Sequence, residues 1–309
     1  MPDDDPPARR RRPRRATRFD DDPPATLSRS RRRPPPEPDD TPQTGDRWSS
    51  WDLSAAGEQG PRPYPDWLVT ELAAVDTELG VLKTGKEADV HLVDRAVPDT
   101  DRGCLLAAKR YRDPQHRLFH RDAGYLEGRR VRRSRETRAM AHRTGFGRQV
   151  IAGQWAAAEF AVLGRLWESA SRFPGGPVAP YPVQLLGTEI LMEFIGDPDT
   201  GQAAPRLAQL RPTPVQLADL WERLVAALRL LATIGLTHGD LSPYNVLVLQ
   251  DRPILIDLPQ VVDLVANPRA PQLLARDVRV ICDWFTARGL PDPDPAGLTA
   301  ILRSDAGLR

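Results

Sequence analysis

A stretch in the C-terminal third of this sequence constrains the fold more than any other. It opens with a helix start, in which Thr213 can cap the helix, Pro214 suits its first turn and Gln216 completes a capping box. Apolar residues with helical spacing follow, at Leu217, Leu220, Trp221, Leu224, Leu228 and Leu231. After the helix come a polar octapeptide, HGDLSPYN, and two strand-like runs, at 238–245, 246–249 and 253–257. The sequence therefore predicts a helix, a polar loop and a hairpin in direct succession.

Strand-like runs dominate the part of the chain before this helix. We expect strands at 80–83, 89–94, 104–111, 182–186 and 189–194. Helices are expected at 66–79 and 150–170, and a last one at 270–287. Because the strands come in groups and do not alternate with helices, the order argues against a doubly wound parallel sheet. The predicted class is α+β in two lobes, with an antiparallel sheet and one helix in the first and mostly helices in the second.

Three polar residues in the constraining stretch have the spacing of a phosphoryl-transfer site. Asn245 follows Asp240 by five residues, and Asp257 follows Asn245 by twelve. Such reactions need one carboxylate beside the attacking hydroxyl, together with an amide oxygen and a second carboxylate that hold Mg²⁺. A single Asp or Asn in a turn usually serves the turn itself. The three residues in this order instead favour the arrangement of kinases.

Together with three other stretches, the two stretches that carry this motif resemble the RIO-type atypical serine/threonine protein kinase family, of which the chain would be a bacterial member. The stretches are TGKEA, WAAAE, MEFIG, HGDLSPYN and IDLPQ, at 84–88, 155–159, 192–196, 238–245 and 256–260. The resemblance covers about residues 80–285. It implies a two-lobed protein-kinase-like fold, with the N-lobe at 63–195 and a truncated C-lobe at 196–309.

The resemblance assigns the chemistry to five residues. Asp240 would be the catalytic aspartate, and Lys109 would contact the α- and β-phosphates of ATP. Glu159 would pair with Lys109, while Asn245 and Asp257 would bind Mg²⁺ or Mn²⁺. The implied activity is phosphoryl transfer from ATP to Ser/Thr hydroxyls of proteins, with autophosphorylation or an ATPase switch as variants.

The resemblance also implies a nucleotide pocket. The phosphate-covering loop would consist of Thr84, Gly85, Lys86 and Glu87. Adenine would bind the backbone of Glu193 and Ile195, in front of Met192. Apolar walls would come from Val90, Ala107, Leu247 and Ile256.

Departures from ordinary protein kinases keep two other interpretations open. Asp257 is followed by Leu-Pro and not by Phe-Gly. Because 52 residues follow Asp257, we expect the peptide-docking helices of ordinary kinases to be missing. Small-molecule kinases of the aminoglycoside or choline type share much of the motif, but they usually have His at Ser242 and Gly at Tyr244. A non-enzymatic nucleotide- or RNA-binding protein is the third interpretation, although no key residue is lost.

Two polar segments lie outside this pattern. Residues 1–62 form a Pro/Arg/Asp-rich stretch for which we expect disorder. Residues 112–150 carry 11 arginines against 4 acids, a formal +7, as expected for a flexible loop. Either segment is expected to be a solvated linker or to contact RNA or a ribosome. The chain has only three lysines, Lys83, Lys86 and Lys109, and all lie near the expected phosphate site.

Composition excludes several protein classes. The sequence has no apolar run near 18 residues and no apolar segment behind its first residues, so neither a membrane span nor a secretory signal is expected. Two cysteines are too few for a disulfide scaffold or a cysteine zinc site. Such cysteine usage points to a reducing cytoplasm.

Overall fold

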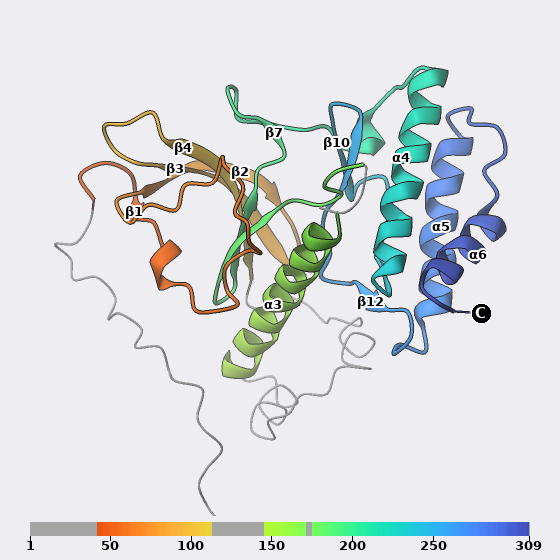
Figure 1. Ribbon diagram of the computed structural model, residues 1–309, viewed down its shortest axis with the longest axis horizontal. Helices are drawn as coiled ribbons and strands as arrows, with labels where there is room; N and C mark the ends of the chain where they lie inside the picture. Colours follow the sequence, from red (N-terminus) through yellow and green to blue (C-terminus); the bar gives the residue numbers. More distant parts are fainter. Residues whose placement is uncertain (1–41, 113–144, 171–174, 309) are drawn as a thin grey trace, which may run out of the picture. The chain divides into compact units, whose positions relative to one another are not determined.

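A six-stranded antiparallel sheet forms the first half of the folded chain. The computed structural model describes residues 42–112, 145–170 and 175–308. The sheet has the strand order β1-β2-β3-β4-β6-β5, with bounds Arg47–Trp48, Val75–Thr84, Ala88–Ala96, Gly103–Tyr111, Glu189–Glu193 and Pro182–Leu186. Helix α3 (Gly145–Ala170) contacts β4, β5 and β6, and it lies between the sheet and the later helices in Figure 1.

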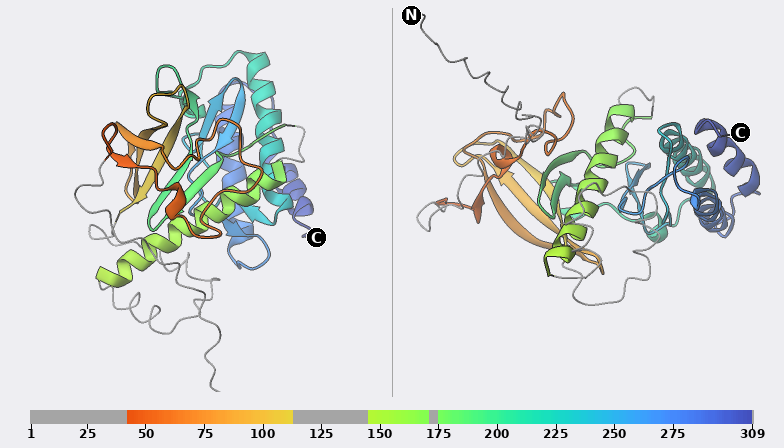
Figure 2. Two further views of the ribbon diagram at one scale, coloured as in Figure 1. Left: turned by 60° about the vertical axis from the view of Figure 1, so that its left-hand side comes forward. Right: turned by 90° about the horizontal axis from the view of Figure 1, so that it is seen from below.

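The second half of the chain is mostly helical. Its helices are α4 (Pro214–Thr233), α5 (Ala270–Thr286) and α6 (Pro295–Asp305), and α4 and α5 both contact α6. A hairpin of β10 (Val246–Leu249) and β11 (Arg252–Leu255) lies between α3 and this helical layer (Figure 2). The expected α+β fold with a sheet lobe and a helical lobe is confirmed.

Short elements connect these parts. Two 3-10 helices, η1 and η2, span Trp51–Leu53 and Leu207–Gln209. Two short strand pairs are β7 with β8, at Gly196–Asp197 and Gln202–Ala203, and β9 with β12, at Leu236–Thr237 and Val262–Asp263. The β9–β12 pair holds the polar octapeptide at the C-terminal end of α4.

The capping residues of α4 act as expected. The Thr213 hydroxyl accepts a hydrogen bond from the Gln216 amide at 3.4 Å, and the Gln216 side chain accepts one from the Thr213 amide at 3.0 Å. The helix begins at Pro214, where the missing amide hydrogen costs nothing. The helix start was therefore readable from local sequence alone.

Three expectations need correction. The helix expected at 66–79 is absent, because β2 begins at Val75 and pairs along its length with β3. The tail boundary at residue 62 is too late, since β1 and η1 precede it and Trp51 is buried at 8% exposure. The loop boundary at residue 150 is also too late, because α3 begins at Gly145. Residues 1–41 and 113–144, on which the other expectations for the two polar segments fall, lie outside the described residues.

A buried ion pair explains why the chain extends at Val75. Asp76, the next residue, is 1% exposed and accepts two hydrogen bonds from the buried Arg95 on β3, at 2.7 and 3.0 Å. Arg95 also donates to Gln184 of β5 at 3.0 Å. Buried charges persist in a core only when they are paired. The pair therefore requires β2 and β3 to lie side by side.

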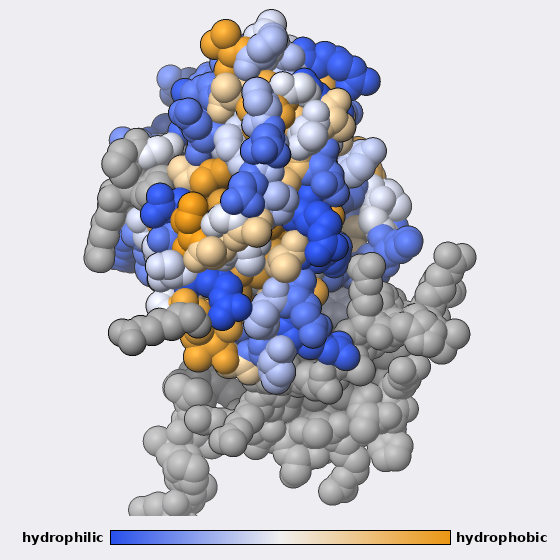
Figure 3. All heavy atoms as spheres, turned by 90° about the vertical axis from the view of Figure 1, so that its right-hand side faces the viewer, coloured by the Kyte–Doolittle hydropathy of each residue, from blue (hydrophilic) through white to orange (hydrophobic). Residues whose placement is uncertain are grey.

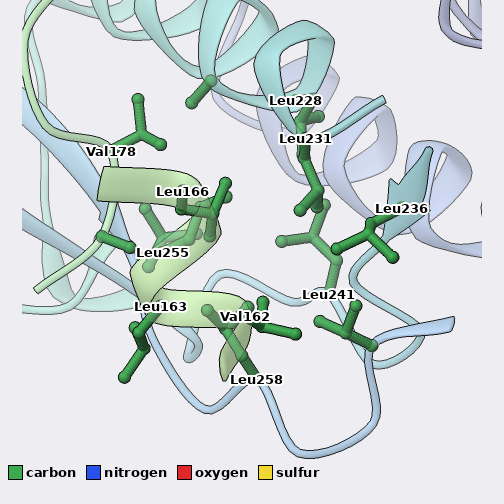
Figure 4. Packing of buried hydrophobic residues seen from close by; sticks show 14 of the residues in the cluster. Val162, Leu163, Leu166, Val178, Leu228, Leu231, Leu236, Leu241, Leu255 and Leu258 are labelled. Carbon is green, nitrogen blue, oxygen red and sulfur yellow. The ribbon is translucent and has the colours of Figure 1, made fainter. Parts of the chain in front are cut away.

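The largest apolar cluster joins α3 to the helical lobe. Val162, Leu163 and Leu166 of α3 lie opposite Leu228 and Leu231 of α4 (Figure 4). Leu241 and Leu258 belong to the same cluster and are each 1% exposed. They directly follow Asp240 and Asp257, so burial of two leucines fixes the backbone beside both carboxylates.

The outer face of the helical lobe is mixed in character. Figure 3 shows hydrophilic and hydrophobic residues interspersed on the face that lies to the right in Figure 1. Exposed apolar side chains of this lobe include Val215, Val265 and Ile301, which come from different elements. Among the described residues, no helix is long and apolar enough to cross a membrane.

Candidate active site

A cleft of about 1070 Å³ brings most of the predicted site residues together. Its lining includes all but two of the predicted residues: Gly85, Lys86, Glu87, Val90, Ala107, Lys109, Glu159, Met192, Glu193, Ile195, Asp240, Leu247, Ile256 and Asp257. Thr84 does not line it; its hydroxyl instead helps to lower the pKa of Asp89, for which hydrogen bonding by Arg112 is the main cause. Asn245 lies just behind the cleft and is 8% exposed.

Lys109 is held by two carboxylates from different elements. Its ammonium nitrogen lies 2.7 Å from Glu159 Oε1 and 2.9 Å from Asp257 Oδ1. Burial alone would lower the pKa of Lys109, but the charges of Glu159 and Asp257 raise it above its ordinary value. Lys109 is therefore a fixed positive charge in the wall of the cleft, which suits an anionic ligand.

Glu159 connects the sheet, α3 and the segment after β11. It is 2% exposed, and besides Lys109 it accepts hydrogen bonds from the Tyr111 hydroxyl and, at 2.9 Å, from the Leu258 amide. The amide belongs to the residue after Asp257, so Glu159 positions the Asp257 backbone as well as the Lys109 side chain. Such a fully satisfied buried carboxylate defines one arrangement of its partners.

Asp257 is strained and charged. Its φ of 64° lies in the left-handed region, which is uncommon for a residue with a side chain and often marks a functional position. Burial would raise its pKa, but Lys109, with smaller contributions from Lys83 and His238, lowers it to about 2. The ammonium of Lys83 lies 3.8 Å from the second carboxylate oxygen. Each oxygen of Asp257 therefore faces a lysine.

The octapeptide at 238–245 forms a loop that is closed on itself. The side chain of Asn245 donates a hydrogen bond from Nδ2 to the Asp240 carbonyl at 2.9 Å, and the backbone amide of Asn245 donates one to the Ser242 carbonyl at 2.9 Å. The Ile256 amide donates to the Asn245 carbonyl at 3.0 Å, and the buried His238 ring lies 3.1 Å from the Ile256 carbonyl. These bonds fix Asp240, Asn245 and Asp257 relative to one another.

Gly239 is required at its position in this loop. Its φ is +77°, and a Cβ built on it would lie 2.2 Å from the Gln260 carbonyl oxygen. Only glycine combines this φ with so close an approach of backbone. The next residue is Asp240, so the glycine sets the direction in which the aspartate enters the cleft.

Asp277 on α5 holds the loop at 238–245 in place, and the sequence analysis did not predict this residue. Its carboxylate accepts hydrogen bonds from the amides of Gly239 at 2.7 Å and Leu241 at 3.1 Å, the residues on either side of Asp240. Burial raises its pKa, against smaller lowering effects of His238 and the two amides. Asp277 lies 36 residues after Leu241, so no local spacing could reveal the contact.

The side chain of Asp240 itself has an arginine partner. Arg276 Nη2 lies 2.9 Å from Asp240 Oδ1, and both side chains are partly exposed at the mouth of the cleft. Arg276 was not predicted, because one arginine among forty carries no signal. Lys83 was also absent from the predicted site, although the scarcity of lysines was a signal that could have found it.

The far end of the cleft is apolar. Val90, Ala107 and Met192 lie on the three adjacent strands β3, β4 and β6, and Leu247 and Ile256 come from the β10–β11 region. The Glu193 carboxylate turns back to accept the Tyr181 amide at 3.0 Å, and burial raises its pKa. A flat aromatic ring suits the space between these two apolar walls.

The donors near Asp257 fit a hard divalent cation. Asp257 supplies carboxylate oxygens on the cleft surface, and the side-chain oxygen of Asn245 is available because its Nδ2 makes the bond to Asp240. Mg²⁺ commonly takes one or two protein oxygens and completes its octahedron with phosphates and waters. No group of three or more His, Cys, Asp or Glu side chains suited to a metal occurs within the described ranges.

Comparisons with known proteins agree with this geometry. The profile of the RIO domain family matches residues 115–296. The chain is 32% identical to the RIO-type serine/threonine-protein kinase Rio1 of Haloferax volcanii, over 75% of this chain and 71% of the relative. It is 37% identical to the protein of the same name from Methanocaldococcus jannaschii, over 31% of this chain and 32% of the relative.

A eukaryotic relative matches over a shorter stretch. The chain is 34% identical to serine/threonine-protein kinase RIO1 of Chaetomium thermophilum, over 44% of this chain. The match spans about a quarter of that relative's length, 26%.

Proposed function

This chain belongs to the RIO domain family, and from that premise we propose that it is an ATP-dependent serine/threonine protein kinase. The observation that carries the proposal is the cleft in which Lys109, Asp240 and Asp257 face one space, with Glu159 behind Lys109. The relatives named above are RIO-type or RIO1 serine/threonine-protein kinases. This favours a protein acceptor over the small-molecule acceptors of aminoglycoside or choline kinases.

Lys109 and the two metal-binding candidates hold the phosphates in this proposal. Lys109, fixed by Glu159, contacts the α- and β-phosphates from the β4 side of the cleft. Asp257 and Asn245 would hold Mg²⁺, or Mn²⁺ in its place. The ion would neutralise phosphate charge and orient the transferred group. Lys109 and Lys83, which both face Asp257, would be within reach of the phosphate oxygens.

Asp240 acts on the acceptor. Its carboxylate accepts the proton of a Ser or Thr hydroxyl as the hydroxyl oxygen forms a bond to the γ-phosphorus. The bond between that phosphorus and the β,γ-bridging oxygen breaks, and ADP leaves with the electron pair. Arg276, whose Nη2 lies 2.9 Å from Asp240 Oδ1, holds the carboxylate in position.

The remaining predicted residues bind the nucleoside and cover the phosphates. The apolar walls enclose adenine, whose edge faces the backbone of Glu193 and Ile195. Gly85, Lys86 and Glu87 form a tight turn, closed by the Gly85 amide, which donates to the Ala88 carbonyl at 3.0 Å. A Cβ on Gly85 would lie 2.7 Å from that carbonyl, so the turn requires glycine. The proposal also retains an RNA or ribosomal contact through residues 112–150.

One labelling experiment separates the candidate reactions. The full chain is incubated with Mg²⁺ and γ-labelled ATP, alone and with a generic protein acceptor, an aminoglycoside or choline. Label on Ser or Thr of a protein supports the proposal. Label on the small molecule alone, or release of inorganic phosphate alone, replaces it with a small-molecule kinase or an ATPase. An absence of all products overturns the enzymatic interpretation.

A further inference from the structure

An exposed tyrosine in the loop at 238–245 contacts a segment that carries Arg206 and Arg211. Tyr244, four residues after Asp240 and directly before Asn245, is 63% exposed. Arg206 donates a hydrogen bond to the Tyr244 carbonyl. Tyr244 lies close enough to Arg288 to raise the pKa of the Arg288 guanidinium, and Arg211 lies close enough to lower it. We call these four residues the arginine surface.

The three arginines come from two separate parts of the chain. Arg206 and Arg211 lie on either side of η2, and η2 is attached to the loop by the Ala208 amide, which donates to the Pro243 carbonyl at 2.9 Å. Arg288 follows the C-terminal end of α5, and its guanidinium lies 3.8 Å from the centre of the Trp284 ring. Two segments that are distant in the sequence thus bring three arginines to the surface beside this loop.

No carboxylate neutralises these cations within the described part of the chain. Arg206 and Arg211 donate to backbone carbonyls, of Tyr244 and Leu210, and Arg288 has a buried Nε without a hydrogen-bond partner. In contrast, many other arginines of the fold have acidic partners, among them Arg47, Arg95, Arg102, Arg110, Arg112, Arg223, Arg229 and Arg276.

The crowding of like charges is unrelieved. Burial and then the charge of Arg211 lower the pKa of Arg288, while the phenol of Tyr244 acts in the opposite direction. Guanidinium groups remain charged at neutral pH despite such shifts. A surface that gathers positive charge without counter-charges has a strong attraction for an anionic partner.

The arginine surface adjoins the position of the acceptor hydroxyl. The bond from Asn245 Nδ2 to the Asp240 carbonyl closes the loop and keeps the residue after Tyr244 in contact with Asp240. Arg206 also lines the cleft together with Asp240. An extended peptide advances about 3.3 Å per residue. Residues a few positions from an acceptor serine at Asp240 therefore reach the arginine surface.

We propose that the arginine surface docks an acidic segment of the protein acceptor and makes this chain a kinase of acidic sites. The inference rests on the proposed function and adds the class of acceptor to it. Asp and Glu side chains flanking the acceptor would pair with the guanidinium groups, and Tyr244 would contact the peptide chain. Guanidinium forks match carboxylates in geometry as well as in charge. A nucleic acid on the same surface would cover the entrance that the acceptor hydroxyl needs, so we favour the peptide.

The test compares three labelled serine peptides of equal length. One has Asp and Glu at two to four positions on both sides of the serine, one has Asn and Gln there, and one has Lys. Binding to the full chain is followed by fluorescence anisotropy without ATP, and phosphorylation is followed with ATP. The main variant is Arg211→Glu with Arg288→Gln, and Arg211→Glu alone serves if the double variant fails to fold. Arg223→Gln, on the exposed face of α4, is the matched control.

We expect wild type to bind the acidic peptide about tenfold more tightly than the neutral one, and the main variant to lose most of this difference. In turnover, the KM for the acidic peptide should rise, while the KM for ATP and kcat on the neutral peptide stay the same. Equal affinity for acidic and neutral peptides, or a preference that survives in the variants, overturns the inference. So does a single-stranded RNA oligonucleotide whose binding depends on Arg211 and Arg288 while the acidic peptide does not bind. Acidic peptide that binds but is never phosphorylated contradicts the proposed function and leaves the docking surface standing.

Discussion

The ammonium nitrogen of Lys109 lies 2.7 Å from a carboxylate oxygen of Glu159, and this contact joins β4 of the sheet to α3. The same carboxylate binds the Tyr111 hydroxyl and the amide that follows Asp257. One buried acid thus connects the proposed phosphate-binding lysine to the proposed metal-binding aspartate. This contact explains how Glu159 and Asp257, which are 98 residues apart in the sequence, come to lie in one cleft.

Replacement of Glu159 by Gln should weaken both the fold and the site. The amide cannot accept all three hydrogen bonds, and buried Lys109 keeps only Asp257 as a charged partner. We expect a loss of about 1–3 kcal/mol in the free energy of unfolding, measured by urea denaturation, and weaker ATP binding. Asp219→Asn, which removes an exposed pair with Arg223, is the control and should cost less than about 0.5 kcal/mol. Equal effects of the two variants would contradict the structural role of Glu159.

The contribution of Asp257 to stability should be lost within a narrow acidic range. Its folded pKa of about 2 lies below the ordinary value of 3.8, so the folded state favours the charged form. Its contribution is therefore fully present above pH 3.8 and is lost as the pH falls towards 2. Because about a third of the side chain is exposed, we expect only about 1 kcal/mol.

The measurement is the stability of wild type minus that of Asp257→Asn, followed by urea denaturation between neutral pH and pH 2. The pKa values of Glu193 and Asp277 are raised and act in the opposite direction, but they cancel in this difference. A difference that stays constant, or grows as the pH falls, would refute the ion pairing of Asp257 with Lys109.

Asp277 should support turnover without binding either substrate. In Asp277→Asn, the side-chain oxygen can still accept a hydrogen bond from one of the two backbone amides, of Gly239 or Leu241. The side-chain NH₂ group then faces the other backbone amide, and two donors cannot form a hydrogen bond. We expect kcat to fall about 10–100-fold, because the loop that carries Asp240 loses its position, while the affinity for ATP changes less than threefold. Steady-state kinetics and calorimetric titration with ATP distinguish these effects. If ATP affinity fell as much as kcat, Asp277 would serve the whole cleft and not the loop alone.

Two glycines with the same φ of +77° allow a matched comparison. An alanine at Gly239 meets the Gln260 carbonyl at 2.2 Å, whereas at Gly235 nothing lies within 4 Å of an added Cβ. Gly235→Ala should therefore cost only the backbone strain, about 1 kcal/mol. Gly239→Ala should cost more and should abolish turnover, because the loop has to move. Thermal unfolding and kinase assays of both variants check this; similar behaviour would remove the special role of Gly239.

Sequence reasoning succeeded where a signal is local. The capping residues Thr213 and Gln216 predicted the start of α4. The spacing of Asp240, Asn245 and Asp257 predicted one site, and the structure brings these three residues together. In these cases the residues that define the feature lie on one continuous stretch of chain. Their geometry follows from a helix, a turn and a hairpin.

The failures have a common physical origin in contacts between distant segments. The residues at 66–79 looked helical, but the buried pair of Asp76 with Arg95 favours a strand. The partners Asp277 and Arg276 come from α5 and reach the loop only in the folded chain. Tertiary contacts of this kind leave no local pattern. Helix α6 is a different case: it was not expected, although its signal is local, with Asp294 as the cap and Leu298 and Leu302 on the buried face.

The most direct test of the account compares ATP binding with phosphoryl transfer in Asp240→Asn. The amide keeps the size of the side chain but cannot accept the proton of the acceptor hydroxyl. The account predicts that ATP affinity in the presence of Mg²⁺, measured by calorimetry, stays within about threefold of wild type. It also predicts that transfer of the γ-phosphoryl group to a protein Ser or Thr falls at least about 100-fold. Unchanged transfer in this variant would contradict the assignment of Asp240 and with it the proposed reaction.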